Sequence, residues 1–156
     1  MPGKMIAELK QSKPFQSLQE EAYLNVLRTA DALGRHLDQL LKRRGLTATQ
    51  YNVLRILRGA GAGGATCRDI GERLINAEPD VTRLLDRMER LEVIARRRND
   101  QDRRFVTVRI TDRGLKLLAE LDRPIQELHK QQFACLSEEE LTQLIAGLEK
   151  TREGLT

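Results

Sequence analysis

The sequence predicts a mainly α-helical fold with one small β-hairpin, and three observations support this prediction. Apolar residues recur at steps of three and four through most of the 156 residues, a spacing that places them on one face of a helix. Between residues 94 and 110 the spacing changes to two, which is typical of strands. Three predicted helix starts carry a Ser or Thr followed three residues later by an acidic or amide side chain, the pattern of a capping box.

The first long helix is expected over residues 17–44. Its apolar face is formed by Leu18, Ala22, Val26, Ala30, Leu33, Leu37, Leu40 and Leu41. At about 1.5 Å per residue, roughly 26 helical residues extend about 39 Å, which is longer than a small domain is wide. Part of this face is therefore expected to pack against something outside its own domain.

Three shorter helices are expected next. Gly45 ends the long helix, and a capping box at residues 47–50 begins a helix whose candidate core residues are Tyr51, Val53, Leu54 and Leu57. Glycines at positions 59, 61, 63 and 64 end it, and Thr66 begins a short helix over 67–74. After a turn, Pro79 takes the first position of a helix over 79–92, because its missing N–H is not needed there. The buried stripe of that helix is expected to contain Val81, Leu84, Leu85, Met88 and Leu91.

The hairpin is expected over residues 94–110, with its turn at residues 99–102. A long helix then begins at Thr111 and Asp112, and a last helix begins at a capping box over residues 137–140. The apolar stripes of these two helices comprise Leu115, Leu118, Leu121, Ile125, Leu128, Leu141, Leu144, Ile145 and Leu148. Both ends of the chain thus carry more apolar surface than one chain is expected to cover, which favours a homodimer.

Basic residues are concentrated in the hairpin. Five arginines lie within residues 96–104, and six arginines against two aspartates between residues 95 and 110 give 6 − 2 = +4, which equals the net charge of the whole chain. Charges this close repel one another unless the turn spreads them or a polyanion neutralises them. Aromatic residues make up only 3% of the chain, which argues against modules that stack single-stranded bases.

The order of the predicted elements is that of a winged helix-turn-helix. In this fold the second helix of the turn motif enters the major groove of double-stranded DNA. A basic hairpin, or wing, beside that helix would lie over the neighbouring minor groove, whose negative potential attracts inserted arginine. The expected partner is therefore double-stranded DNA.

Two stretches of the sequence resemble a known family. Residues 46–57, LTATQYNVLRIL, and residues 80–114, DVTRLLDRMERLEVIARRRNDQDRRFVTVRITDRG, are similar to the multiple antibiotic resistance regulator (MarR) family of bacterial transcription factors. The shared pattern is the V-T-R-L-L-D-R-M-E core of a recognition helix, a D-R-R wing and a T-x-x-G helix start. The resemblance covers most of the chain, because the long terminal helices fall where the family keeps its dimerisation region.

The resemblance implies a symmetric homodimer that binds a pseudo-palindromic operator, usually as a repressor. It implies a winged helix-turn-helix DNA-binding domain over residues 45–111 and a helical dimerisation region over residues 1–44 and 112–156. It also implies that DNA is released when a small phenolic or anionic effector binds between the two regions. No cofactor is implied.

The expected recognition helix supplies three candidate DNA contacts on its polar face. Thr82 and Arg83 are expected at base edges, because Arg83 can bridge guanine O6 and N7. Arg87 is expected to contact phosphate. The alternative is a solvated helix face with an ion pair between Asp86 and Arg90, worth only a few tenths of a kcal/mol.

Residues near the starts of the two short helices supply three more candidates. Thr66 and Arg68 are expected to fix the register on the phosphate backbone. Asp80, which with Pro79 stands where family members often have Ser or Thr, would repel phosphate but can accept a hydrogen bond from cytosine N4.

The wing candidates are Arg103 and Arg104. Asp102 is expected to hold one of them by a charge-assisted bond, so that the other stays aimed at the groove. The alternative is a hairpin whose charges pair across its strands.

The remaining residues argue against other classes of function. Cys67 and Cys135 lack CxxC spacing, and His36 and His129 are isolated, so neither a metal site nor a disulfide framework is expected. A reducing, cytoplasmic compartment is expected, with no membrane span. No nucleophile–base set or phosphate-binding loop indicates an enzyme. Two alternatives stay open: a thiol-based redox-sensing regulator of the same fold, and a winged-helix protein–protein adaptor.

Overall fold

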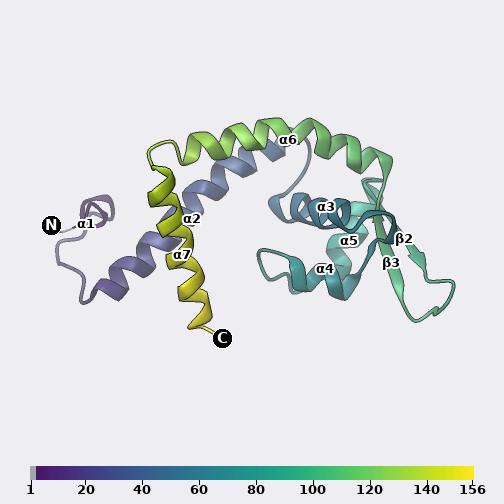
Figure 1. Cartoon of the computed structure of the whole chain (residues 1–156), viewed down its shortest axis with the longest axis horizontal. Coiled ribbons are helices and arrows are strands. Elements are labelled where there is room, and N and C mark those ends of the chain that lie inside the picture. The colour runs from purple at the N-terminus through teal and green to yellow at the C-terminus, as the bar shows by residue number, and fades with distance from the viewer. Residues whose placement is uncertain (1–2) are drawn as a thin grey trace.

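The computed structural model describes residues 3–156 and is drawn in Figure 1. The elements in chain order are α1 (Met5–Glu8), α2 (Leu18–Lys42), α3 (Ala48–Ala60), a 3-10 turn (Gly61–Gly63), β1 (Ala65–Thr66), α4 (Cys67–Arg73), α5 (Val81–Arg90), β2 (Ile94–Arg98), β3 (Val106–Ile110), α6 (Asp112–Gln132) and α7 (Glu138–Glu153). This mainly helical arrangement with a small antiparallel sheet confirms the predicted fold class.

The predicted capping boxes begin the helices. Thr47 Oγ1 accepts from the Gln50 backbone N–H at 3.1 Å, and Gln50 Oε1 accepts from the Thr47 N–H at 3.0 Å. The boxes at the starts of α4 and α7 have the same reciprocal geometry. Each box satisfies two backbone donors that a helix N-terminus otherwise leaves unpaired. Gly45 ends the turn after α2 with φ +72°, a conformation that favours glycine.

The sheet has three strands in the order β1-β3-β2, all antiparallel. In the hairpin Ile94 faces Ile110 and Arg98 faces Val106. The short strand β1 pairs with β3 on the other side and is not predicted by the sequence, because its two residues are too few to show a period. Gly64 precedes β1 with φ +66°, and a Cβ there would lie 2.4 Å from the Val108 carbonyl oxygen.

The hydrophobic core lies between α3, α5, the sheet and the middle of α6. Leu54 and Leu57 of α3, Met88 of α5, Val108 of β3 and Leu118 of α6 are fully buried. At roughly 25 cal/mol per Å² of apolar surface removed from water, each such side chain contributes about 1.5–3 kcal/mol. Because α6 packs on both α2 and α3, this core joins the long helices to the winged region.

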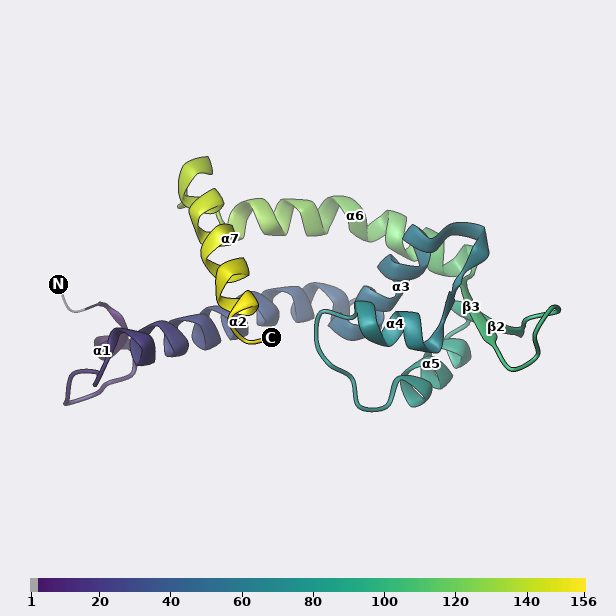
Figure 2. The same cartoon turned by 60° about the horizontal axis from the view of Figure 1, so that its bottom comes forward.

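Figures 1 and 2 show the winged region at one end of the molecule, with the β2–β3 hairpin projecting from it, and α1 with the start of α2 at the other end. The N-terminal half of α2 and all of α7 bury little within the chain. Their exposed apolar residues are Leu18, Tyr23, Val26, Leu27, Leu144, Ile145 and Leu148. The excess apolar surface expected at both chain ends is therefore present in the structure.

Two details of the predicted recognition helix are wrong. The helix begins at Val81 rather than Pro79, because Asp80 is its N-cap and its side chain accepts from the Arg83 N–H. Leu91 caps the C-terminus of α5 and is 39% exposed instead of buried.

Candidate nucleic-acid interface

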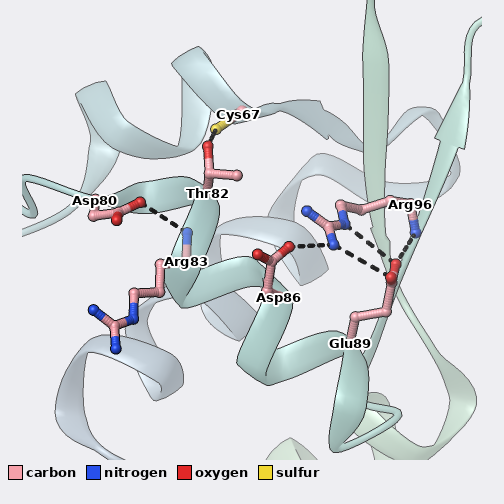
Figure 3. Close-up of polar contacts among 7 residues, drawn as sticks. All are labelled: Cys67, Asp80, Thr82, Arg83, Asp86, Glu89 and Arg96. Carbon is pink, nitrogen blue, oxygen red and sulfur yellow. Dashed lines mark hydrogen bonds and ion pairs between the residues drawn. The ribbon is translucent and has the colours of Figure 1, made fainter.

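The polar face of α5 is open to solvent. Leu84, Leu85 and Met88 fix the helix on the core, and Thr82, Arg83 and Arg87 are exposed on its other faces. The first turn of α5 packs on the start of α4, where Cys67 Sγ lies 3.9 Å from Thr82 Oγ1 (Figure 3). The two helices α4 and α5 thus form the turn motif predicted from the sequence.

Asp80 has a clear structural role. Its Oδ1 accepts from the Arg83 backbone N–H at 2.9 Å, which satisfies one free donor at the start of α5 (Figure 3). The negative charge of Asp80 also interacts favourably with the partial positive charge at the N-terminus of α5. The sequence pattern assigns Asp80 to base contact and does not identify this cap.

Thr66 and Arg68 lie at the start of α4. Thr66 Oγ1 accepts from the Asp69 N–H at 3.1 Å, and the Thr66 N–H donates to Asp69 Oδ2 at 3.0 Å. Hydrogen bonding by the Thr66 side chain and backbone lowers the pKa of the Asp69 carboxyl group. The Arg68 Nε atom donates to Glu72 Oε1 at 2.9 Å, and this side-chain hydrogen bond raises the pKa of Arg68. Arg68 remains exposed, and solvent screens an exposed ion pair of this kind, so a stronger anion can displace Glu72.

The wing arginines differ in their partners. Arg104 donates from Nε and Nη2 to the two carboxylate oxygens of Asp102 at 3.1 and 3.0 Å, and its backbone N–H also bonds Asp102. These bonds lower the pKa of Asp102. Among residues 3–156 no ion pair to Arg103 is found. One wing arginine is thus held and the other is free.

Arg96 is the hairpin residue whose surroundings the sequence pattern predicts wrongly. The sequence pattern groups Arg96 with the arginines that are expected to bind a polyanion. In the structure its side chain is only 25% exposed and forms ion pairs with two carboxylates of α5, Asp86 and Glu89 (Figure 3). The Asp86–Arg90 pair considered as an alternative is replaced by this contact. A period of two from the buried Ile94 places Arg96 on the inner face of β2, which is the signal that could have found it.

The remaining hairpin cations face solvent. Arg97, Arg98, Arg103 and Arg109 are exposed, and none of them forms an ion pair within the described part of the chain. With the exposed arginines of α5, they make one end of the molecule positively charged. A surface of this kind attracts phosphate backbones.

Other kinds of site find little support among residues 3–156. No group of three or more His, Cys, Asp or Glu side chains is placed to hold a metal ion. No helix there combines the length and apolar character needed to cross a membrane. Cys67 is partly buried and Cys135 exposed, and both are free thiols.

Comparison with known proteins identifies the family. Residues 46–106 match the model of the MarR family. The chain is 40% identical to a MarR transcription factor from Planctomyces limnophilus, with a TM-score of 0.67 over 86% of this chain and 98% of that one. It is 29% identical to S. aureus MepR in a MepR–DNA complex, with a TM-score of 0.76 over 85% and 96% of the two chains. It is also 28% identical, over 80% of its own length and 83% of the relative's, to the homoprotocatechuate degradative operon repressor of Escherichia coli. The chain therefore belongs to the MarR family of DNA-binding transcriptional regulators.

Proposed function

We propose that the protein is a homodimeric repressor that binds a pseudo-palindromic operator and releases it when a small phenolic or anionic ligand binds. The observation that carries the proposal is the exposed arginine surface shared by α5 and the β2–β3 wing at one end of the chain. The relatives support it: MepR forms a complex with DNA, and the homoprotocatechuate protein is named a repressor.

In this proposal α5 reads the major groove. Thr82 and Arg83, exposed on its first turn, contact base edges, and Arg87 contacts phosphate. Asp80 accepts from a cytosine amino group through the carboxylate oxygen that does not cap the helix. Thr66 and Arg68 fix the backbone register, with phosphate replacing Glu72 as the partner of Arg68.

The wing reaches the adjacent minor groove. Arg103, which has no ion-pair partner among residues 3–156, enters the groove. Asp102 holds Arg104 against the turn, which lowers the entropic cost of ordering that side chain on DNA.

The dimer is formed by the helical ends of the chain, residues 1–44 and 112–156, while residues 45–111 bind DNA. The exposed apolar residues of α2 and α7 supply the surface that a second copy covers. Two-fold symmetry then presents two recognition helices to successive major grooves, about 34 Å apart on B-form DNA.

The effector site is a hollow of about 550 Å³ between α2, α3 and the segment after α4. Its lining combines apolar Leu37 and Ile56 with the cationic Arg55 and Arg73, a mixture suited to an aromatic acid or phenol. Asn52 in this hollow accepts from the Ile75 N–H at 2.8 Å. It thereby anchors the segment that leads into α5, so a ligand that displaces Asn52 would move the recognition helix.

Charge reversal in the wing tests DNA binding. We expect Arg103→Glu with Arg104→Glu to weaken binding to every duplex by more than tenfold, because two cations that bind phosphate are replaced by two anions that repel it. The matched control is Lys10→Glu with Lys13→Glu, which makes the same charge change at the other end of the molecule. If both variants bind duplex DNA as the wild type does, the proposal fails and the adaptor alternative gains support.

Ligand release is tested with benzoate and phenol as probes. We expect either probe to raise the melting temperature and lower operator affinity, and Arg55→Gln with Arg73→Gln to remove the effect of benzoate. Mild oxidation of the wild type is the control for thiol sensing. Release by oxidant alone would favour the redox-sensing alternative and contradict the ligand-release part of the proposal.

A further inference from the structure

Arg96, Asp86 and Glu89, here called the Arg96 cluster, join the recognition helix to the wing. Arg96 lies on β2, and the two acids lie one turn apart on α5. The Arg96 Nη2 atom donates to Asp86 Oδ1, and Nε and Nη2 donate to the two oxygens of Glu89 at 3.3 Å. The Arg96 backbone N–H also donates to Glu89 at 3.2 Å. Figure 3 shows the guanidinium between the two carboxylates.

The cluster is more shielded than an ordinary surface ion pair. The Arg96 side chain is 25% exposed, against 87% for Arg104 in the wing. The hydrogen bond from Arg96 lowers the pKa of Glu89, and the bonds from Glu89 and Asp86 raise the pKa of Arg96. A guanidinium shared by two carboxylates in this geometry is fixed in place and has few donors left for phosphate.

The charges of the cluster are unexpected for a DNA-binding helix. One arginine and two carboxylates sum to −1, beside a helix that is proposed to approach a polyanion. By charge alone these acids weaken DNA binding. We therefore expect the two acids to have a structural role whose benefit to DNA binding is larger than their repulsion of the phosphates.

We propose that Arg96 is a positioning residue that sets the recognition helix relative to the wing, so that both elements reach their grooves on one operator at once. This inference rests on the proposed function. It assigns the cluster to operator specificity rather than to phosphate affinity. Non-specific duplexes, which need only the basic surface, do not depend on the cluster.

The variant Glu89→Gln separates a charge effect from a positioning effect by the sign of the change. If only charge mattered, removing an acid would tighten binding to all DNA. The proposal instead predicts that operator affinity falls roughly tenfold, the effect of removing a charge-assisted hydrogen bond, while affinity for a random duplex stays constant or rises. The matched control is Glu92→Gln, which removes the same charge from the exposed pair with Arg113 just after α5 and is expected to leave the operator preference unchanged.

Two substitutions of Arg96 separate positioning from direct binding to DNA. Arg96→Lys keeps the charge but not the shared geometry, so operator affinity is expected to fall while the slope of log K against log salt stays constant. If Arg96 bound phosphate directly, Arg96→Gln would reduce that slope by about 0.9 per subunit. Melting curves at fixed protein concentration show that each variant is folded at the temperature of the binding assay.

The outcomes are distinct. A tighter complex of Glu89→Gln with the operator, or a smaller salt slope for Arg96→Gln, overturns the positioning role. A wild-type protein that binds no duplex overturns the proposed function itself. Loss of operator preference in Glu89→Gln and Arg96→Lys, with random-duplex affinity retained, supports the inference.

Discussion

Replacing Gly114 by Ala tests how closely α6 approaches the winged region. Gly114 is buried in the first turn of α6, and its N–H donates to Thr111 Oγ1 at 3.1 Å. A Cβ added at Gly114 would lie 2.4 Å from the Val93 carbonyl oxygen and 2.7 Å from Ile110 Cγ1. The T-x-x-G helix start noted in the sequence thus has a steric cause: a methyl group has no room between α6, the Val93 carbonyl just before β2 and the Ile110 side chain at the end of β3.

The magnitude follows from these distances. Real Cβ atoms essentially never approach another heavy atom within 3.0 Å, so α6 or β2 has to shift by at least 3.0 − 2.4 = 0.6 Å. Overpacking of this kind costs up to about 3 kcal/mol. The gain in helix propensity from Gly to Ala offsets about 1 kcal/mol. We therefore expect Gly114→Ala to lose about 2 kcal/mol, or about 4–8 °C in melting temperature for a chain of this size.

The assay is thermal unfolding followed by circular dichroism at one fixed protein concentration, because the melting temperature of a dimer depends on concentration. The control is Gly59→Ala in the last turn of α3, where an added Cβ meets nothing within 4 Å. That variant is expected to gain about 0.5–1 kcal/mol. Equal stabilisation of both variants would refute the close approach of α6 to β2.

Three further predictions concern the ion pair between Arg58 and Asp122, the N-cap of α3 at Thr47 and the exposed apolar face of α7. The hydrogen bond from Arg58 lowers the pKa of Asp122 below its ordinary value of 3.8. The ionised Asp122 carboxylate therefore contributes fully to the free energy of unfolding above pH 3.8, and this contribution is lost as pH falls through the lower pKa of the folded state. Asp122→Asn should therefore destabilise at pH 7 and lose less stability on acidification than the wild type does, as measured by urea unfolding from pH 7 down to about pH 3. Thr47→Ala should cost about 1 kcal/mol in the same assay, whereas Thr47→Ser should be nearly neutral; equal losses would contradict the cap. Ile145→Glu should convert a dimer to a monomer in sedimentation velocity, and an unchanged dimer would exclude α7 from the interface.

Features that depend on neighbouring residues are predicted well from the sequence. The capping box at Thr47 needs only residues three positions apart, so its pattern is visible without the fold. The hairpin is predictable for a similar reason, since the change of period at Ile94 and the polar turn at residues 99–102 are local signals. The register is not predicted in the same way. A turn confined to residues 99–102 would pair Arg98 with Arg103, whereas in the structure the loop continues to residue 105 and Arg98 pairs with Val106.

Contacts between separate elements are predicted less well. The partners of Arg96 lie seven and ten residues earlier on α5, across a turn in which the backbone of Glu92 has φ +60°. The spacing of apolar residues within one helix or one strand does not predict the path of the turn between them. β1 has the same difficulty, because its pairing with β3 requires the close approach at Gly64 to the Val108 carbonyl.

The arginines of the hairpin therefore cannot be treated as one uniform charge. Of the six between residues 95 and 110, Arg96 is bound to two acids and Arg104 to one, which leaves 6 − 2 = 4 without an ion pair among residues 3–156. The charge of a paired arginine is already partly neutralised by its carboxylate. When such an arginine binds a DNA phosphate, we expect fewer counterions to be released from the DNA than when an unpaired arginine binds. The salt dependence of DNA binding should accordingly be set mainly by Arg97, Arg98, Arg103 and Arg109 together with the exposed arginines of α5. The paired Arg104 should contribute less, so the salt slope should be smaller than the full count of arginines in the sequence predicts.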